Sequence, residues 1–180
     1  MAATTIARPA STEYVPYFAR YVDLVPDGDV LELLRRQVDE TAALVGKLSD
    51  RDAEYRYAEG KWSVKEVIGH LSDCERIFVY RALCFARGEK AALPSFDENE
   101  YARASNAGTR ALGELLAELR TVRSATLSFF SGLDADALLR RGVASQREYT
   151  VRALAWITAG HERHHCNIIR ERYLPGLKRT

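Results

Sequence analysis

The sequence has 180 residues, of which 47% are hydrophobic and 28% charged, with 26 Lys and Arg against 25 Asp and Glu. This apolar content excludes disorder over the whole chain. A net charge of +1 argues against a nucleic-acid binder, which must neutralise phosphates, and against a polybasic membrane anchor. The length suits one domain.

The cysteine pattern and the start of the chain indicate a cytoplasmic protein. Cys74, Cys84 and Cys166 are odd in number and contain no C-x-x-C pair, so they form neither a disulfide framework nor a thiolate zinc site. The first residues lack the cationic and apolar segments of a signal peptide. No stretch approaches the roughly 18 apolar residues that span a bilayer. We therefore expect no membrane partner.

The N-terminal segment predicts an extended arm. Pro9, Pro16 and Pro26 interrupt helical backbone, whereas the aromatic residues between them favour burial. We therefore expect residues 1–26 to pack as an arm on a single domain formed by residues 27–180.

Two amphipathic helices are predicted after the arm. The first, over residues 27–48, begins at an aspartate cap and repeats apolar residues every three or four positions. The second covers residues 63–87. Ser63 and Glu66 form the S-x-x-E capping box at its start, and Gly88 follows its end.

Two further helices complete the predicted bundle. Residues 88–108 form a long connection with a short helix near 97–104, and the third helix covers 109–130. The fourth covers 151–173 behind a Thr150 cap. No segment shows the sustained alternation of a strand. The sequence therefore predicts an all-α protein: an up-down four-helix bundle with a long helix 2–3 connection and an extended N-terminal arm.

The four histidines, His70, His161, His164 and His165, lie on inward faces of the second and fourth helices. At about 100° per residue, His161 shares its face with the apolar residues four and seven positions before it, and His70 shares its face with Cys74. Two imidazoles on one helix and a third from a facing helix build a three-nitrogen metal site with an open position. The spacing leaves His164 and His165 as alternative partners of His161. The competing interpretation is a set of hydrogen-bonded core histidines.

The segment from His161 to His165 also matches the H-E-x-x-H pattern of zinc peptidases, in which the glutamate acts as general base. Such enzymes take their third ligand from downstream, where Glu171 is the remaining acid and lies on another side of the helix. A zinc peptidase is therefore a minor alternative. We expect Glu162 to be solvated or paired with a nearby arginine.

Two blocks of the sequence resemble the DinB-like superfamily. The first begins at Gly60 with GKWSVKEVIGHL and continues through Asp73, Glu75-Arg76 and the YRAL of residues 80–83. The second is the AGHERHH of residues 159–165. The RPASTEYVPYFARYVDLV segment near the N-terminus is similar to one branch of the family, so the resemblance covers most of the chain.

This resemblance implies an up-down four-helix bundle, often a homodimer, with a divalent metal on His70, His161 and His165. The metal is zinc or nickel in the first instance, with iron or manganese as alternatives. Family members of known activity are transferases or isomerases that use a low-molecular-weight thiol. We therefore expect a metal-dependent thiol S-transferase, or a related hydrolase or isomerase, acting on a small-molecule substrate and not on nucleic acid. The alternative is a non-catalytic metal-binding or interaction protein.

Other residues on the same faces are candidates for supporting roles. Asp73 and His164 could hydrogen-bond a ligand histidine or move a proton, although Asp73 has arginines nearby with which to pair. Trp62 and Arg81 are candidates for lining a pocket. Cys74 is at the spacing of a fourth, sulfur ligand, which would close the open position.

A second apolar surface is expected on the fourth helix, away from the histidines. It is a candidate for the homodimer interface. It comprises Ala155, Trp156, Cys166 and Tyr173.

Overall fold

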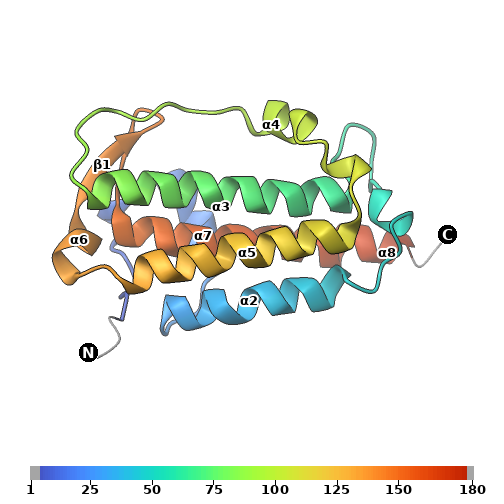
Figure 1. The fold of residues 1–180 in the computed structure, drawn as a ribbon, viewed down its shortest axis with the longest axis horizontal. Helices are drawn as coiled ribbons and strands as arrows, with labels where there is room; N and C mark the ends of the chain where they lie inside the picture. Colours follow the sequence, from blue (N-terminus) through green and yellow to red (C-terminus); the bar gives the residue numbers. More distant parts are fainter. Residues whose placement is uncertain (1–4, 178–180) are drawn as a thin grey trace.

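The computed structural model describes residues 5–177 and shows four long helices packed side by side (Figure 1). The four are α2 (Val30–Val45), α3 (Val64–Ala86), α5 (Leu112–Ser131) and α7 (Val151–Ile168). The predicted all-α four-helix bundle is therefore confirmed. Within the described residues, no helix is long and apolar enough to cross a membrane.

Three of the four long helices begin at a capping side chain, whereas α5 begins three residues later than expected, after Ala111, which forms no side-chain cap. The Ser63 hydroxyl accepts a hydrogen bond from the Glu66 amide at 3.2 Å, and the Ser63 amide donates to the Glu66 carboxylate at 2.6 Å. Asp29 and Thr150 cap α2 and α7 in the same way. These side chains satisfy amide groups that have no partner within the helix.

The C-terminal helix ends differently from the expected regular helix. After Ile168 the backbone passes through a π-helical turn, Ile169–Tyr173, and then into α8 (Leu174–Leu177).

The long connection sets the direction of the third helix of the bundle. It carries the chain back along the length of α3, so that α5 runs parallel to α3 while α2 and α7 run the opposite way (Figure 1). The hydrophobic clusters agree with this direction. The first turns of α3 and α5 share one cluster, which contains Leu71 and Leu115, and their last turns share the other, which contains Phe85 and Phe130. The directions are therefore up, down, down, up, so the expected up-down alternation holds between α2 and α3 and between α5 and α7 but not between α3 and α5.

Shorter elements occupy the connections. The predicted helix within residues 88–108 is α4 (Glu98–Ala104), and 3-10 turns occur at Ser11–Glu13, Pro16–Phe18, Asp52–Glu54 and Ala107–Thr109. The arm ends in the short helix α1 (Ala19–Val22), and α6 (Ala135–Leu139) follows α5.

A small antiparallel hairpin between α6 and α7 was not expected from the sequence. It consists of β1 (Arg141–Ala144) and β2 (Arg147–Thr150), joined by a two-residue turn. Its strands have four residues each, too few for a recognisable alternation, and the turn lacks the Asn-Gly or Asp-Gly signal of hairpins. The Leu93 amide donates to the Val143 carbonyl at 2.9 Å, which ties the hairpin to the long connection.

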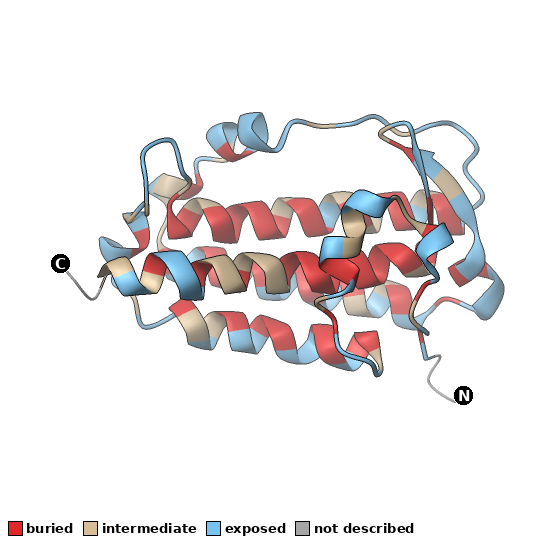
Figure 2. Ribbon diagram, turned by 180° about the vertical axis from the view of Figure 1, so that it is seen from behind, coloured by how far each residue is buried: buried red, intermediate tan, exposed pale blue. Residues whose placement is uncertain are grey.

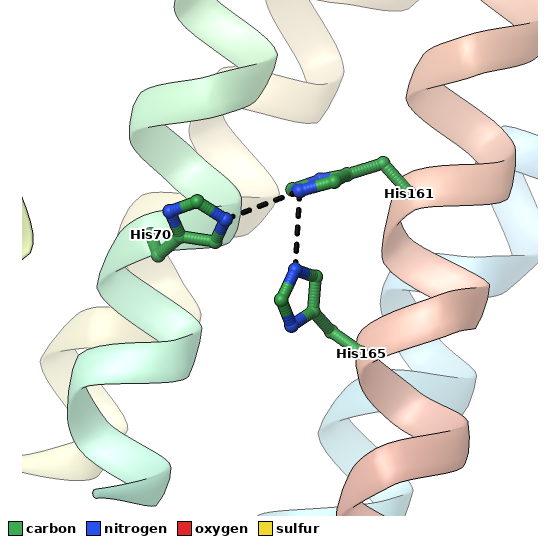
Figure 3. Close-up of side chains that lie close together, drawn as sticks. All are labelled: His70, His161 and His165. Atoms are coloured by element: carbon green, nitrogen blue, oxygen red, sulfur yellow. Dashed lines mark hydrogen bonds between the residues drawn. The ribbon is translucent and has the colours of Figure 1, made fainter. Parts of the chain in front are cut away.

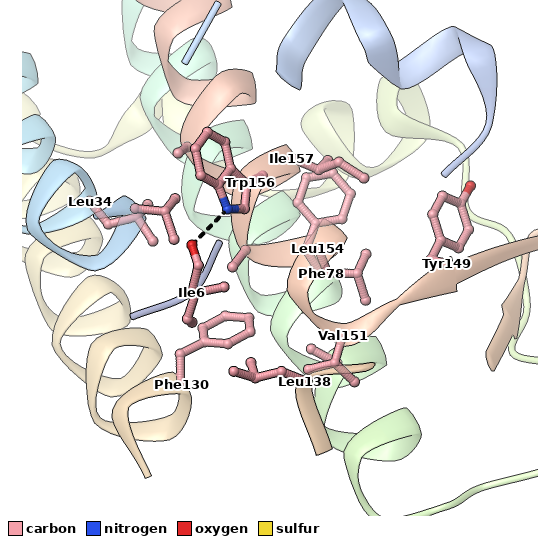
Figure 4. Close-up of a cluster of buried hydrophobic side chains, with 14 of the residues drawn as sticks. Ile6, Leu34, Phe78, Phe130, Leu138, Tyr149, Val151, Leu154, Trp156 and Ile157 are labelled. Carbon is pink, nitrogen blue, oxygen red and sulfur yellow. Dashed lines mark hydrogen bonds between the residues drawn. The ribbon is translucent and has the colours of Figure 1, made fainter. Parts of the chain in front are cut away.

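The N-terminal arm covers the α7 face that was the candidate for the homodimer interface. Trp156 is 1% exposed, and its indole N–H donates to the Ile6 carbonyl at 3.2 Å (Figure 4). Figure 2 shows the arm in front of α7, with buried residues on the part of α7 that it crosses. Ala155, Cys166 and Tyr173 are also buried within the chain.

The predicted dimer surface is thus wrong. Residue spacing reveals that a helix face is apolar, but it does not reveal which part of the chain covers that face. The homodimer itself remains a prediction.

A buried carboxylate anchors the arm to the start of α7. Glu13 is 5% exposed and accepts hydrogen bonds from the Thr150 hydroxyl at 2.8 Å, the Ala10 amide at 2.9 Å and the Arg152 guanidinium. Burial alone would raise the pKa of Glu13, but these donors outweigh burial and lower it from 4.5 to about 2. The ionised form of Glu13 therefore stabilises the docked arm.

We predict that Glu13→Gln lowers the free energy of unfolding by about 2 kcal/mol at pH 7, because charge-assisted hydrogen bonds are lost. A depressed carboxyl pKa stabilises the fold fully above about pH 4.5 and stops doing so as the pH falls towards 2. Urea denaturation should therefore show the two proteins converging between these values.

The control for this experiment is Glu148→Gln, which removes an exposed carboxylate that pairs with Arg141 on the hairpin. It should change stability by less than about 1 kcal/mol. Equal stability of Glu13→Gln and the wild type at pH 7 would contradict the anchoring role.

Candidate metal centre

Three histidine side chains converge between α3 and α7. His70 projects from α3 and meets His161 and His165, which project from successive turns of α7 (Figure 3). The Nε2 atom of His161 lies 3.1 Å from Nε2 of His70 and 3.2 Å from Nε2 of His165. The sequence-predicted trio is therefore brought together, with its ring nitrogens within 4.8 Å of one another.

The nitrogen separations fit a shared metal ion better than hydrogen bonds. Ligand nitrogens at about 2.0–2.1 Å from a tetrahedral zinc ion are about 3.3–3.4 Å apart, close to the separations observed here. An imidazole nitrogen carries either one proton or one lone pair, so Nε2 of His161 can make at most one good hydrogen bond to its two neighbours. A cation facing all three lone pairs satisfies every nitrogen.

The surroundings keep these imidazoles neutral. Burial lowers the pKa of His70 to about 4. Burial, followed by the neighbouring histidines, holds the pKa values of His161 and His165 well below 6.5. Neutral imidazole is the form that binds metals, so at neutral pH all three side chains have a lone pair available.

A close contact with the arm completes one wall of the centre. A Cβ atom at Gly160 would lie 2.0 Å from the Tyr21 carbonyl oxygen, so glycine is required where the arm crosses α7. The Tyr21 ring then packs edge-on against His161 at 5.3 Å and His164 at 5.2 Å between ring centroids. The sequence analysis did not identify Tyr21 as a site residue. The aromatic residues of the arm, which favour burial, were the signal that could have identified it.

A cavity of about 440 Å³ opens beside the histidines. Trp62 and Arg81, the two predicted pocket residues, both line it, and the Trp62 ring lies 4.5 Å from the His70 ring. A cavity of this size suits a small molecule. Its other walls are mostly aromatic and basic, and they include Tyr17, Phe18, Arg20, Phe78, Phe96, Glu98, Arg147 and Tyr149.

The candidate supporting residues take different positions. His164 lines the cavity without joining the trio. Cys74 also lines it, with its sulfur 3.6 Å from both ring nitrogens of His70, and burial raises the pKa of its thiol so that it stays protonated. Asp73 lies outside the cavity lining and pairs with Arg76 at 3.4 Å. Of the two alternatives for Asp73, the structure therefore shows the arginine pair, and no hydrogen bond from Asp73 to a histidine occurs among the described residues.

Glu162 is not solvated, contrary to expectation. It is 2% exposed, pairs with Arg123 at 2.8 Å and accepts a hydrogen bond from the Thr41 hydroxyl at 2.6 Å. The reason is that α7 is buried on several sides, so the residue next to His161 faces α2 and α5 rather than water. The glutamate of the H-E-x-x-H pattern is therefore buried in an ion pair and faces away from the three histidines. It is not placed to act as the base that a zinc peptidase needs.

Residues 33–169 match the family model of the DinB superfamily. The chain belongs to the DinB superfamily. A curated relative from Geobacillus thermodenitrificans (strain NG80-2), described as a "putative metal-dependent hydrolase", is 30% identical over 74 residues. The match covers 41% of this chain and only 42% of that relative.

Two solved structures share the fold. YfiT from Bacillus subtilis, described as "a probable metal-dependent hydrolase with an unusual four-helix bundle topology", superimposes with a TM-score of 0.72 at 18% identity, over 83% of this chain and 84% of YfiT. A mycothiol-dependent maleylpyruvate isomerase gives 0.65 at 14% identity, over 81% of this chain and 61% of the isomerase. At these identities the likeness concerns the bundle alone.

We predict that Arg123→Met lowers the free energy of unfolding by about 3–5 kcal/mol, because it leaves two carboxylates, Glu75 and Glu162, buried without a cation. Glu162→Gln should cost far less, since Arg123 keeps Glu75 as its partner. Urea denaturation of both variants tests this order.

The metal content of Glu162→Gln should also be measured, and we expect it to equal the metal content of the wild type. A loss within 1 kcal/mol for Arg123→Met, or a loss of metal from Glu162→Gln, would contradict the structural role assigned to this ion-pair network.

Proposed function

We propose that this protein is a metal-dependent enzyme that binds one divalent ion on His70, His161 and His165 and acts on a small molecule in the adjoining cavity. The convergence of three imidazole nitrogens beside a cavity of about 440 Å³ carries this proposal. Three protein ligands leave a coordination position open, as in reactive rather than structural sites. Imidazole ligands suit zinc or nickel first, with iron or manganese as alternatives.

The reaction that we favour is transfer involving a low-molecular-weight thiol. A bound divalent ion would lower the pKa of a thiol or water at the open position and so keep it nucleophilic at neutral pH. A thiolate attacks without a neighbouring base, whereas hydrolysis commonly employs one. Among the described residues, the group of candidate ligand atoms contains no carboxylate, and Glu162 is held by Arg123. Among the described residues, the ligand group itself therefore contains no general base.

The chain's own side chains shape the site around this chemistry. Trp62 and Tyr21 pack against the histidine rings and limit the access of water to them. His164 lies in the cavity wall without joining the trio, and a role in proton transfer stays a prediction for it.

Hydrolysis is the second candidate because one carboxylate, Glu98, does line the cavity. The curated relative and YfiT are both described as metal-dependent hydrolases, which supports the same alternative. Glu98 would then be the residue to activate water.

The cellular setting belongs to the proposal as well. All three cysteines are free thiols, as expected for a protein of the reducing cytoplasm.

We also propose a homodimer, which sedimentation analysis of the purified protein can test.

We predict that the purified wild type holds about one equivalent of a divalent metal, and that His161→Ala and His165→Gln hold little, because each loses one of three ligands. Elemental analysis by mass spectrometry measures this directly. His164→Ala is the matched control: it removes a histidine from the same helix turn and should keep the wild-type content. Equal metal content in the wild type and His161→Ala would overturn the proposal.

Turnover assays on the metal-loaded protein separate the candidate activities. We expect consumption of an electrophilic aryl halide that depends on glutathione, mycothiol or bacillithiol and stops on chelation. Ester hydrolysis without any thiol, lost in Glu98→Gln, would instead establish the hydrolase. Metal binding with neither activity would favour the non-catalytic alternative.

A further inference from the structure

One buried cation in the cavity wall lacks a counter-charge. Arg81, on α3, is 4% exposed and forms no salt bridge among the described residues. Its Nη2 donates to the Pro94 carbonyl and the Ser145 hydroxyl, each at 3.0 Å, and both acceptors are neutral. A guanidinium carries five N–H donors in a planar fork. The Nε and Nη1 groups of Arg81 have no hydrogen-bond partner in residues 5–177, although the side chain lines the cavity.

The other buried cations of the described chain are all paired. Arg123 contacts two carboxylates at 2.8 Å, and Lys65 lies 3.4 Å from each of two more, those of Asp50 and Glu54. A buried charge without a partner is costly, and this fold avoids that cost elsewhere. Arg81 is the exception, and it is the one of these three that faces the cavity.

The hairpin places further donors beside Arg81. Tyr149 on β2 is 2% exposed and lines the cavity, and its hydroxyl makes no hydrogen bond within the described residues. Arg147 lines the same cavity from the same strand. Burial raises the pKa of Tyr149, while Arg81 and then Arg147 act to lower it, which places both guanidinium groups within electrostatic reach of this hydroxyl.

The hairpin turn holds Ser145 against Arg81. Ser145 and Gln146 have φ values of 52° and 61°, in the left-handed region that residues other than glycine and asparagine avoid. Such strain persists where the surrounding structure requires it. Here the turn brings the Ser145 hydroxyl onto Arg81 and so fixes the direction of the guanidinium.

The charges and shape of the cavity define the class of ligand. Three arginines, Arg20, Arg81 and Arg147, line it against one acid, Glu98. We propose that Arg81, Arg147 and Tyr149 form a subsite for the carboxylate group of a small organic acid whose apolar body lies among the aromatic walls. This deepens the proposed function and rests on it, because it identifies the molecule in the cavity as an organic acid.

The donor set favours a carboxylate over a phosphate monoester. The two oxygens of a carboxylate match one guanidinium fork, and the Tyr149 hydroxyl can add a further hydrogen bond. A phosphate ester carries nearly two charges on three oxygens and is commonly held by several backbone amides or a helix N-terminus. The structure offers one buried fork, that of Arg81, together with the side-chain hydroxyls of Tyr149 and Ser145.

Calorimetric binding of three matched probes to the purified full-length protein tests the subsite. Phenylacetate should bind at least about tenfold more tightly than its neutral isostere phenylacetamide, because charge-assisted hydrogen bonds are lost in the amide. Phenyl phosphate should bind more weakly than phenylacetate. Arg81→Gln should abolish the preference for the acid, and Arg147→Gln and Tyr149→Phe should reduce it.

The controls separate this subsite from the metal. Arg141→Gln removes an arginine from the same hairpin that pairs with Glu148 outside the cavity, and it should bind phenylacetate as the wild type does. The acid preference should survive chelation, and Arg81→Gln should keep the wild-type metal content. Loss of metal from His161→Ala thus tests the enzyme proposal independently of the acid preference.

Several outcomes would overturn the subsite. These are equal affinity for phenylacetate and phenylacetamide, tighter binding of phenyl phosphate, or an acid preference that disappears on chelation. Should Arg81→Gln fail to fold, an unchanged preference in both Arg147→Gln and Tyr149→Phe would also overturn it, since Arg147 is exposed and Tyr149→Phe removes only a hydroxyl.

Discussion

One guanidinium joins the four long helices. Arg123 of α5 donates to the Leu34 carbonyl of α2 and forms salt bridges with Glu75 of α3 and Glu162 of α7. Two carboxylates on one buried cation can only be satisfied when the helices hold a fixed rotation. With Glu162 turned towards Arg123, the next face of α7 carries His161 and His165 towards α3. The rotation of α7 that pairs Glu162 with Arg123 is therefore the same rotation that points the two histidines towards α3.

The sequence contained enough local information to predict the helices and an inward cluster of histidines, and the resemblance to the DinB-like superfamily then favoured His165 over His164. Capping residues such as Ser63 act within one turn, and the helical repeat brings His161 and His165 to one face regardless of the rest of the chain. Contacts between distant segments were not predictable in this way. The partner of Glu162 is 39 residues away in the chain, and the cover of Trp156 is 150 residues away. Residue spacing identifies a face but not its neighbour.

The family match covers the metal centre but only part of the cavity wall. All three histidines lie within residues 33–169, which match the DinB superfamily. Part of the cavity wall lies before residue 33, since Phe18 and Tyr21 come from the arm. Gly160 is the link between the two parts, because it admits the arm to the face of α7 that carries His161. The comparisons therefore bear on the metal centre more directly than on the substrate.

Electrostatics connects the two proposed binding sites. The three histidines are neutral, so the metal-free cavity already carries an excess of positive charge from its arginines. A divalent cation on the histidines would add two more charges to the same poorly solvated space, and repulsion from Arg81 would oppose its binding. A carboxylate between them offsets this repulsion. Because coupling between two ligands is reciprocal, an organic acid that strengthens metal binding must itself bind more tightly when the metal is present.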